Sequence, residues 1–98
     1  MRKRTQSREC ALKILYQAEL TRRDIHSAAE NFWGEFKEID ENIQTFADRI
    51  TSGIEKNFEE IDNKISEHAT NWQLKRMAVI DRNVLRIGVF ELLHAADI

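Results

Sequence analysis

Hydrophobic residues recur at helical spacing in five stretches of this chain, and polar residues fill the segments between them. In the first stretch, apolar positions three or four residues apart form a single stripe: Ala11, Ile14, Leu15 and Ala18. The pattern as a whole predicts five helices: Ser7–Leu20, a short helix from Ser27, a long helix after Asp40, Glu59–Ala69 and Asp81–Ala95.

Residues that commonly cap helices support three of these boundaries. Ser27-Ala-Ala-Glu30 matches the capping box, in which a hydroxyl and a carboxylate each accept a hydrogen bond from a free backbone amide. Asp40 is the expected N-cap of the third helix, with Glu41 at the positive end of its dipole. Asn57 marks the expected break before the fourth helix.

The fifth predicted helix is apolar on nearly every side, which is typical of a helix at the centre of a bundle. We therefore predict an all-α fold, a compact bundle of about five helices around this central apolar C-terminal helix. Arg86 and Glu91 interrupt it and are expected to be paired or to reach the rim, with a structural role for Arg86. Gly53 is expected to allow close approach of another backbone, and Gly88 is expected to let a neighbour approach closely.

The composition agrees with a small helical domain. The chain has 98 residues, no proline and three glycines, so we expect a single domain with a modest core. Further core positions are predicted at large side chains outside the main stripes: Ile61, Ile65, His68, Leu85, Phe90, and Trp72, Leu74 and Met77 of a connection over residues 71–77.

The single cysteine and the absence of long apolar runs limit the class of protein. Cys10 has no partner for an intrachain disulfide or a cysteine metal cluster, and we interpret it as a small buried hydrophobe. No run approaches the roughly 20 apolar residues of a membrane span, and charged residues interrupt any signal-peptide core. We therefore expect a cytoplasmic protein without membrane contact.

Charge is distributed unevenly along the chain. Arg2, Lys3, Arg4 and Arg8 precede the first acidic residue, whereas the remaining 90 residues carry 11 Lys and Arg against 17 Asp and Glu. A basic start on an acidic body is typical of a protein that binds phosphate at one end. A solvated tail without function is the alternative interpretation of the same charges.

Motifs for catalysis are missing. His26, His68 and His94 lack metal-ligand spacing relative to each other and to Cys10. There is no glycine-rich phosphate loop and no Gly-x-Ser-x-Gly elbow. The sequence therefore predicts neither an enzyme nor a bound cofactor.

Two segments together resemble the NusB family of transcription antitermination factors. The first is Arg8-Glu-Cys-Ala-Leu-Lys-Ile-Leu-Tyr16, which follows the basic residues. The second comprises three pieces in order: Trp72-Gln-Leu-Lys-Arg-Met77, Val79-Ile-Asp-Arg-Asn-Val-Leu-Arg86 and Phe90-Glu-Leu-Leu93. Either segment alone is weak evidence for the family. Both segments in this order, within an all-α chain, make the resemblance specific.

The resemblance implies a NusB-like fold that lacks the last two helices of the family, with a basic flexible tail over residues 1–8 and a helical RNA-binding domain over 9–98. Without those helices, we expect uncovered apolar surface around Ile87, Phe90 and Leu93. Exposed patches of this kind favour self-association, so the chain is expected to compensate by forming a homodimer or by exchanging helices with a second copy.

The resemblance also implies partners and site residues. NusB-like proteins bind single-stranded boxA RNA together with NusE, a ribosomal small-subunit protein, and act indirectly with other Nus factors and RNA polymerase. By matching motif positions, the RNA contacts are Arg2, Lys3, Arg4 and Arg8. The partner contacts transfer to Tyr16 and Asp81, with Arg82 and Lys75 as weaker candidates. Half-buried packing is the alternative for Tyr16, and plain N-capping of the fifth helix is the alternative for Asp81.

Two other functions compete with this interpretation. The same helical fold serves as an N-terminal RNA-binding domain in some ribosomal RNA cytosine methyltransferases, although nothing in this chain resembles a methyl-donor site. The other competitor is a helical homodimer with no role in RNA binding.

Overall fold

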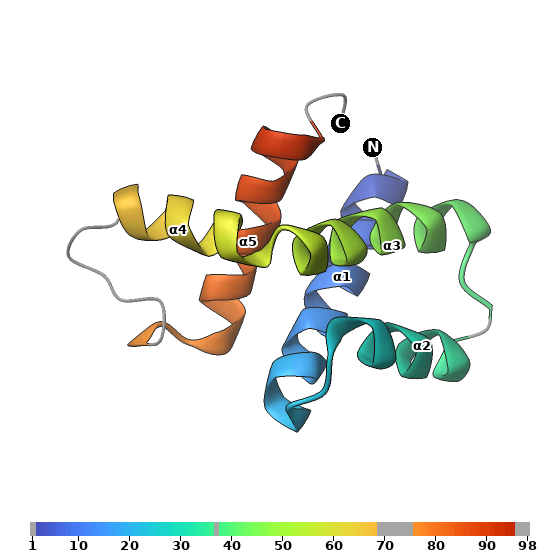
Figure 1. Ribbon diagram of the computed structural model, residues 1–98. Helices are drawn as coiled ribbons and strands as arrows, with labels where there is room; N and C mark the ends of the chain where they lie inside the picture. Colours follow the sequence, from blue (N-terminus) through green and yellow to red (C-terminus); the bar gives the residue numbers. More distant parts are fainter. Residues whose placement is uncertain (1, 37, 69–75, 96–98) are drawn as a thin grey trace.

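A computed structural model describes residues 2–36, 38–68 and 76–95 of the chain. The described part contains five helices: α1 (Arg2–Thr21), α2 (Ile25–Glu35), α3 (Glu41–Lys56), α4 (Phe58–His68) and α5 (Val79–His94) (Figure 1). The predicted all-α bundle of about five helices is confirmed.

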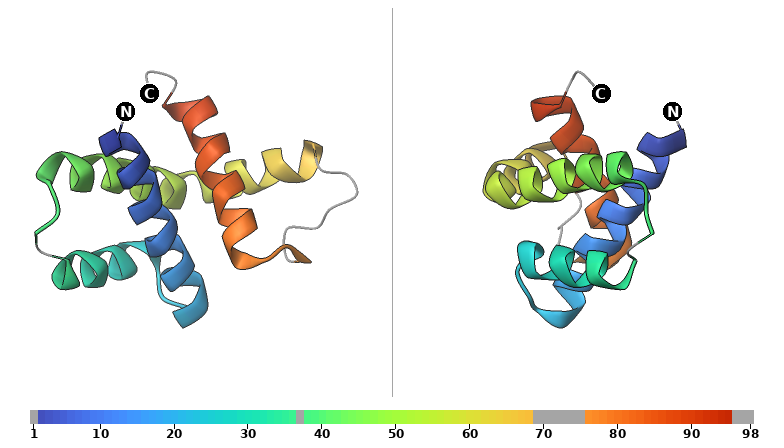
Figure 2. Two further views of the ribbon diagram at one scale, coloured as in Figure 1. Left: turned by 180° about the vertical axis from the view of Figure 1, so that it is seen from behind. Right: turned by 90° about the vertical axis from the view of Figure 1, so that its right-hand side faces the viewer.

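The helices are organised around α3, which contacts each of the other four. Figure 1 shows α2 running back alongside α3, and α4 continuing beyond α3 after a break at Asn57. α1 and α5 lie side by side and run in opposite directions (Figure 2). The start of α1 and the end of α5 therefore lie at the same end of the molecule.

The core lies on both sides of the apolar stripe of α1. One side of the stripe packs with α3, α4 and α5 in the larger cluster: Ala11, Leu15, Ile50, Ile54, Ile61, Ile65, Ile87, Phe90 and Ala95. The other side packs against α2 in the smaller cluster: Ile14, Ala18, Ala28, Ala29 and Phe32. Burial of these apolar side chains supplies the main stabilising free energy of such a bundle.

α1 begins at Arg2, so its predicted start at Ser7 is wrong, and the expected tail over residues 1–8 is helical in its described part. No helix breaker stands between Arg2 and Ser7, and most side chains there favour helix. The buried Ser7 hydroxyl shares its hydrogen between the carbonyl oxygens of Lys3 and Ile43, each 2.9 Å away. This contact fixes the first turns of α1 against α3.

α2 begins earlier than predicted because its N-cap is Asp24. The Asp24 carboxylate accepts a hydrogen bond from the Ser27 backbone amide at 2.7 Å, and α2 starts at Ile25. This backbone hydrogen bond lowers the pKa of Asp24. The predicted capping box from Ser27 to Glu30 is therefore wrong. At α3 the predicted N-cap is confirmed, since Asp40 accepts from the Asn42 amide at 2.7 Å.

α5 differs from the expected enclosed central helix, because only one of its faces is buried. Its inner face carries the buried residues Asn83, Arg86, Ile87 and Phe90. Its outer face is exposed at several large apolar side chains: Ile80, Val84, Leu85, Leu92 and Leu93. A helix that is apolar all round does not reveal from its sequence which face its neighbours cover. The predicted uncovered surface is thus present at Leu93 and absent at Ile87 and Phe90, and Leu85 is not a core residue.

Gly53 and Gly88 differ in the space that surrounds them. A Cβ atom on Gly53 would overlap the ring of Phe90, so the expected close approach is confirmed, although the neighbour is a side chain and not a backbone. A Cβ atom on Gly88 would meet nothing within 4 Å, so the expected close approach there is wrong.

The remaining predicted core positions have mixed outcomes. Ile61 and Ile65 are buried, whereas His68 is exposed at the end of α4. Met77 is half-buried. Trp72 and Leu74 lie outside the residues that the structure describes.

Candidate nucleic-acid interface

The first two turns of α1 carry the basic residues that the sequence analysis selected. Lys3 and Arg4 are exposed and Arg8 is half-buried. Arg2 belongs to the helix, but its side chain lies outside what the structure describes. Because these residues belong to one helix, their backbone positions are set by α1, and we call Arg2, Lys3, Arg4 and Arg8 the basic end.

Each described cation of the basic end contacts another helix or its cap. The Lys3 ammonium lies 3.2 Å from the carboxylate of Asp40, the N-cap of α3. The Arg4 guanidinium lies over the ring of Phe46, 5.1 Å from its centroid. The hydrogen bond from the Asn42 backbone amide lowers the pKa of Asp40, and the hydrogen bond from Lys3 lowers it further. The Lys3 and Arg4 contacts connect α1 with the first half of α3 and its N-cap.

Arg8 is held from the opposite side by α5. Its Nε donates to Oε2 of Glu91 at 2.9 Å, and one Nη donates to Oε1 at 2.8 Å. The hydrogen bond to Glu91 raises the pKa of Arg8. A parallel pair of such bonds is the strong form of an arginine–carboxylate contact. Glu91 was expected to be paired or to reach the rim, and its pairing with Arg8 confirms this.

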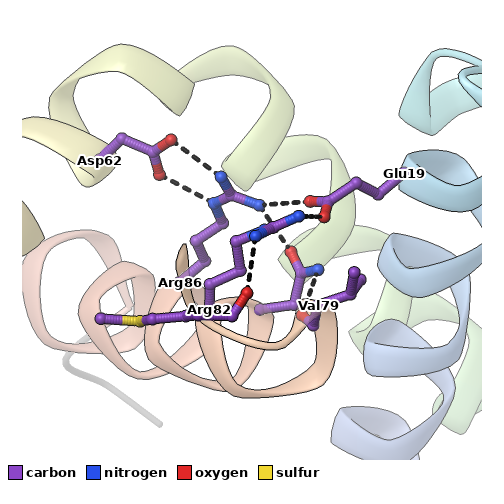
Figure 3. Close-up of polar contacts among 7 residues, drawn as sticks. Glu19, Asp62, Val79, Arg82 and Arg86 are labelled. Carbon is purple, nitrogen blue, oxygen red and sulfur yellow. Dashed lines mark hydrogen bonds and ion pairs between the residues drawn. The ribbon is translucent and has the colours of Figure 1, made fainter. Parts of the chain in front are cut away.

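At the other end of α1, a polar network connects α1, α4 and α5 (Figure 3). Buried Arg86 donates to both carboxylate oxygens of Asp62, at 2.8 and 2.9 Å, and to Glu19 at 3.0 Å. Arg86 also donates to the Asn83 side chain at 2.9 Å, and its guanidinium stacks 4.5 Å from the Phe58 ring centroid. The predicted structural role of Arg86 is confirmed.

Glu19 receives hydrogen bonds from two arginines in this network. Arg82 donates one hydrogen bond to Glu19 and another to the carbonyl oxygen of Met77, the second at 2.9 Å. Burial raises the pKa of Glu19, but the hydrogen bonds and charges of Arg82 and Arg86 outweigh burial and leave the pKa below its ordinary value. Glu19 is therefore an ionised link between α1 and α5.

Three of the four candidate partner residues, Tyr16, Asp81 and Arg82, lie in the described part of the chain, on α1 and α5. Tyr16 is half-buried and lines an open groove of about 540 Å³ between α1 and α2, which Ile80 of α5 also borders. Asp81 follows Ile80 and is exposed in the first turn of α5. Because the N-cap of α5 is Ala78, plain N-capping by Asp81 is wrong. Arg82 is directed toward Glu19, and Lys75 lies outside the described residues.

Sequence reasoning missed the acidic partners Asp40, Glu91 and Glu19 because the pairs are far apart in the chain. Arg8 and Glu91 are separated by 83 positions, and Arg86 and Glu19 by 67. One signal for these pairs is present in the sequence: Arg86 and Glu91 are charges in an otherwise apolar helix and therefore need partners. That signal does not say which residues the partners are.

Other site chemistry is limited in the described part of the chain. No group of three His, Cys, Asp or Glu side chains there is arranged to hold a metal ion. Cys10 is half-buried beside the smaller core cluster, and burial raises the pKa of its thiol. Among the helices of this part, none combines the length and apolar character needed to cross a membrane.

Comparisons with known proteins place this geometry in context. The model of the NusB family matches residues 5–98. The transcription antitermination protein NusB of Anaeromyxobacter dehalogenans is 40% identical over 92 residues, covering 94% of this chain and 65% of that protein. Those of Bdellovibrio bacteriovorus and Myxococcus xanthus are each 41% identical, over 95 and 98 residues, covering 96% and 97% of this chain and 68% and 70% of those proteins. The chain thus spans about two thirds of the length of these relatives.

A solved structure shares the fold. A chain in a structure described as the crystal structure of a plectonemic RNA supercoil superposes with a TM-score of 0.85 at 28% sequence identity. The match covers 95% of this chain and 67% of that chain. The arrangement of helices is therefore that of a known experimental fold.

Proposed function

Because this chain belongs to the NusB family, we propose that it is an RNA-binding transcription antitermination factor. The observation that carries the proposal is the family match over residues 5–98 together with the basic end of α1. The relatives named above are antitermination proteins, which favours this function over the RNA-binding domain of a methyltransferase.

The proposed RNA site is the basic end, with Arg2, Lys3, Arg4 and Arg8 binding single-stranded boxA RNA. Lys3 and Asp40 have side chains that are 59% and 40% exposed, and such surface pairs contribute little to stability. A phosphate therefore replaces Asp40 at little cost. Arginine guanidinium groups suit both phosphates and the faces of unstacked bases, which single-stranded RNA offers.

The proposed protein partner is NusE, bound along the groove that Tyr16 and Ile80 line and at the exposed Asp81. Arg82 contributes indirectly, since its guanidinium is engaged by Glu19. Lys75 follows from the family resemblance alone. Other Nus factors and RNA polymerase are reached through this complex.

The experiment that tests the function is a titration of the chain into fluorescent boxA-like RNA and a scrambled control, at two salt concentrations, with and without NusE. If three or four phosphates are neutralised, log affinity falls with log salt at a slope of roughly −2 to −3 for a single strand. We expect a preference for boxA-like RNA that NusE strengthens. Equal affinity for both RNAs in the presence of NusE contradicts the proposal.

A matched pair of variants locates the RNA site. Lys3→Gln with Arg4→Gln removes two charges from the basic end, whereas Arg22→Gln with Arg23→Gln removes two exposed charges from the opposite end of α1. We expect the first variant to weaken RNA binding and to reduce the magnitude of the salt slope by about 1.4, at about 0.7 for each phosphate contact on a single strand. Equal weakening by both variants would mean that net charge alone attracts the RNA.

A second pair of measurements tests the partner surface. Asp81→Ala is expected to weaken NusE binding while RNA binding by the chain alone is unchanged. An Asp81→Ala protein that stays folded and binds NusE normally removes Asp81 from the interface.

A further inference from the structure

Arg8 differs from the other cations of the basic end in how it is held. Glu91 accepts from Nε and from one Nη, so the two groups face each other along one edge of the planar guanidinium. Among the described residues, no acceptor binds the second Nη of Arg8. A guanidinium carries five N–H donors in a fixed fork, so a second edge remains for another acceptor.

The pair is costly to separate. The side chains of Arg8 and Glu91 are 38% and 17% exposed, compared with 59% and 40% for Lys3 and Asp40. Removing Arg8 would leave a carboxylate that is mostly shielded from water without its cation, which is strongly unfavourable. An incoming phosphate therefore gains more by binding the second edge of Arg8 than by displacing Glu91.

We propose that Glu91 is a positioning residue for RNA binding: it holds the Arg8 guanidinium by one edge and directs the other edge toward an RNA phosphate. The inference rests on the proposed RNA-binding function and deepens it at one contact. An arginine held in this way loses little side-chain freedom when the phosphate binds. Lys3 and Arg4, which are exposed, adjust to the strand while Arg8 supplies a fixed reference point.

The sign of one substitution tests the proposal. Glu91→Gln removes a negative charge beside the RNA site, so general electrostatics predicts tighter binding of an anion. Positioning predicts the opposite. A glutamine amide has one acceptor oxygen where the carboxylate has two, and its NH2 group is a donor that cannot accept from the guanidinium, so the parallel pair of bonds to Nε and Nη is lost. We expect Glu91→Gln to bind boxA-like RNA about fivefold more weakly, with a salt slope smaller in magnitude by about 0.7.

Glu41→Gln is the matched control. Glu41 is an exposed acid in the first turn of α3, next to the Asp40 that pairs with Lys3, so its loss changes charge near the basic end without releasing Arg8. We expect this control to bind RNA as tightly as the native chain or slightly more tightly. Native or tighter affinity of Glu91→Gln with an unchanged salt slope overturns the proposal.

A measurement on the native sequence covers the case in which Glu91→Gln does not fold. With ¹⁵N-arginine, the Nε–H signal of Arg8 is assigned by its loss in Arg8→Lys and is followed as RNA is added. We expect the signal to persist at its position, because the bond to Glu91 remains in the complex. Movement to the position of a free arginine overturns the positioning role. If the native chain does not distinguish boxA-like from scrambled RNA, the proposed function fails first and this inference fails with it.

Discussion

At Gly53 the packing of α3 against α5 depends on the absence of one methyl group. The ring of Phe90 occupies the space that a Cβ atom would need, and Phe90 is only 3% exposed, so the ring cannot move aside. We predict that Gly53→Ala destabilises the chain by about 1–3 kcal/mol, as overpacking of a core does. Denaturant unfolding followed by circular dichroism measures the change.

Gly88→Ala is the natural control for this prediction. Gly88 is also helical, but a Cβ atom there meets open space. Alanine restricts the unfolded chain and favours helix, so we expect stabilisation by about 0.5–1 kcal/mol. Changes of the same sign at both glycines would contradict the assigned contact with Phe90.

Glu19 makes the stability of the fold depend on pH. Its pKa in the folded chain lies below the ordinary value of 4.5, so its contribution is fully present above about pH 4.5 and is lost as pH falls through the folded-state pKa. We predict that Glu19→Gln lowers the free energy of unfolding by about 2 kcal/mol at neutral pH, because it weakens hydrogen bonds to two arginines. The deficit should shrink as pH is lowered from 6 toward 3.

Urea unfolding of both proteins across this pH range provides the comparison. Glu38→Gln changes an exposed carboxylate in the turn before α3 and should remain close to the native chain at every pH. A deficit of Glu19→Gln that stays constant with pH would mean that the substitution disturbs packing and not an ionised contact.

At the level of helices, the N-cap of α2 is the boundary where the structure replaces the predicted cap with another residue. Asp24 accepts from the Ser27 amide, so Asp24→Ala should lower the free energy of unfolding. Glu30, the acid of the rejected capping box, instead pairs with His26 in a contact where the two side chains are 75% and 71% exposed. Glu30→Ala is therefore expected to change the unfolding free energy by less than about 0.5 kcal/mol. Thermal and denaturant unfolding of the two variants measures both losses of stability. A larger loss for Glu30→Ala than for Asp24→Ala would support the capping box instead of the Asp24 cap.

The helix boundaries show how much of the fold local sequence patterns predict. Asp40 was predicted correctly because an N-cap residue stands just before a clear apolar stripe. At α2 the Ser27 pattern was wrong, because the extended backbone of Asp24 and its hydrogen bond from the Ser27 amide place the N-cap three residues earlier. The start of α1 was missed because the basic residues lack an apolar stripe, and the contact that fixes Ser7 comes from Ile43 in another helix.

Across the whole molecule, ion pairs fix how α1 and α5 lie against each other. Arg8 pairs with Glu91 near one end, and Glu19 pairs with Arg82 and Arg86 near the other, so the charges match only when the helices are antiparallel. The sequence predicted the basic residues themselves but not this pairing, because the partners are 83 and 67 positions apart in the chain. The candidate RNA residues therefore belong to the framework of the fold as well as to its surface.

The exposed outer face of α5 leads to a prediction about self-association. Leu92 is 80% exposed, and Leu85, Val84 and Leu93 on the same helix are 41–50% exposed. Contiguous apolar surface of this kind favours association between copies of a chain. We predict that the native chain shows a mass above the monomer at high concentration by light scattering, and that Leu92→Lys shifts it toward the monomer. Leu20→Lys is the control, since Leu20 is 55% exposed but lies at the end of α1 away from Leu92. A native chain that remains monomeric at all concentrations and unfolds cooperatively on heating would show that this face stays in water without a second copy.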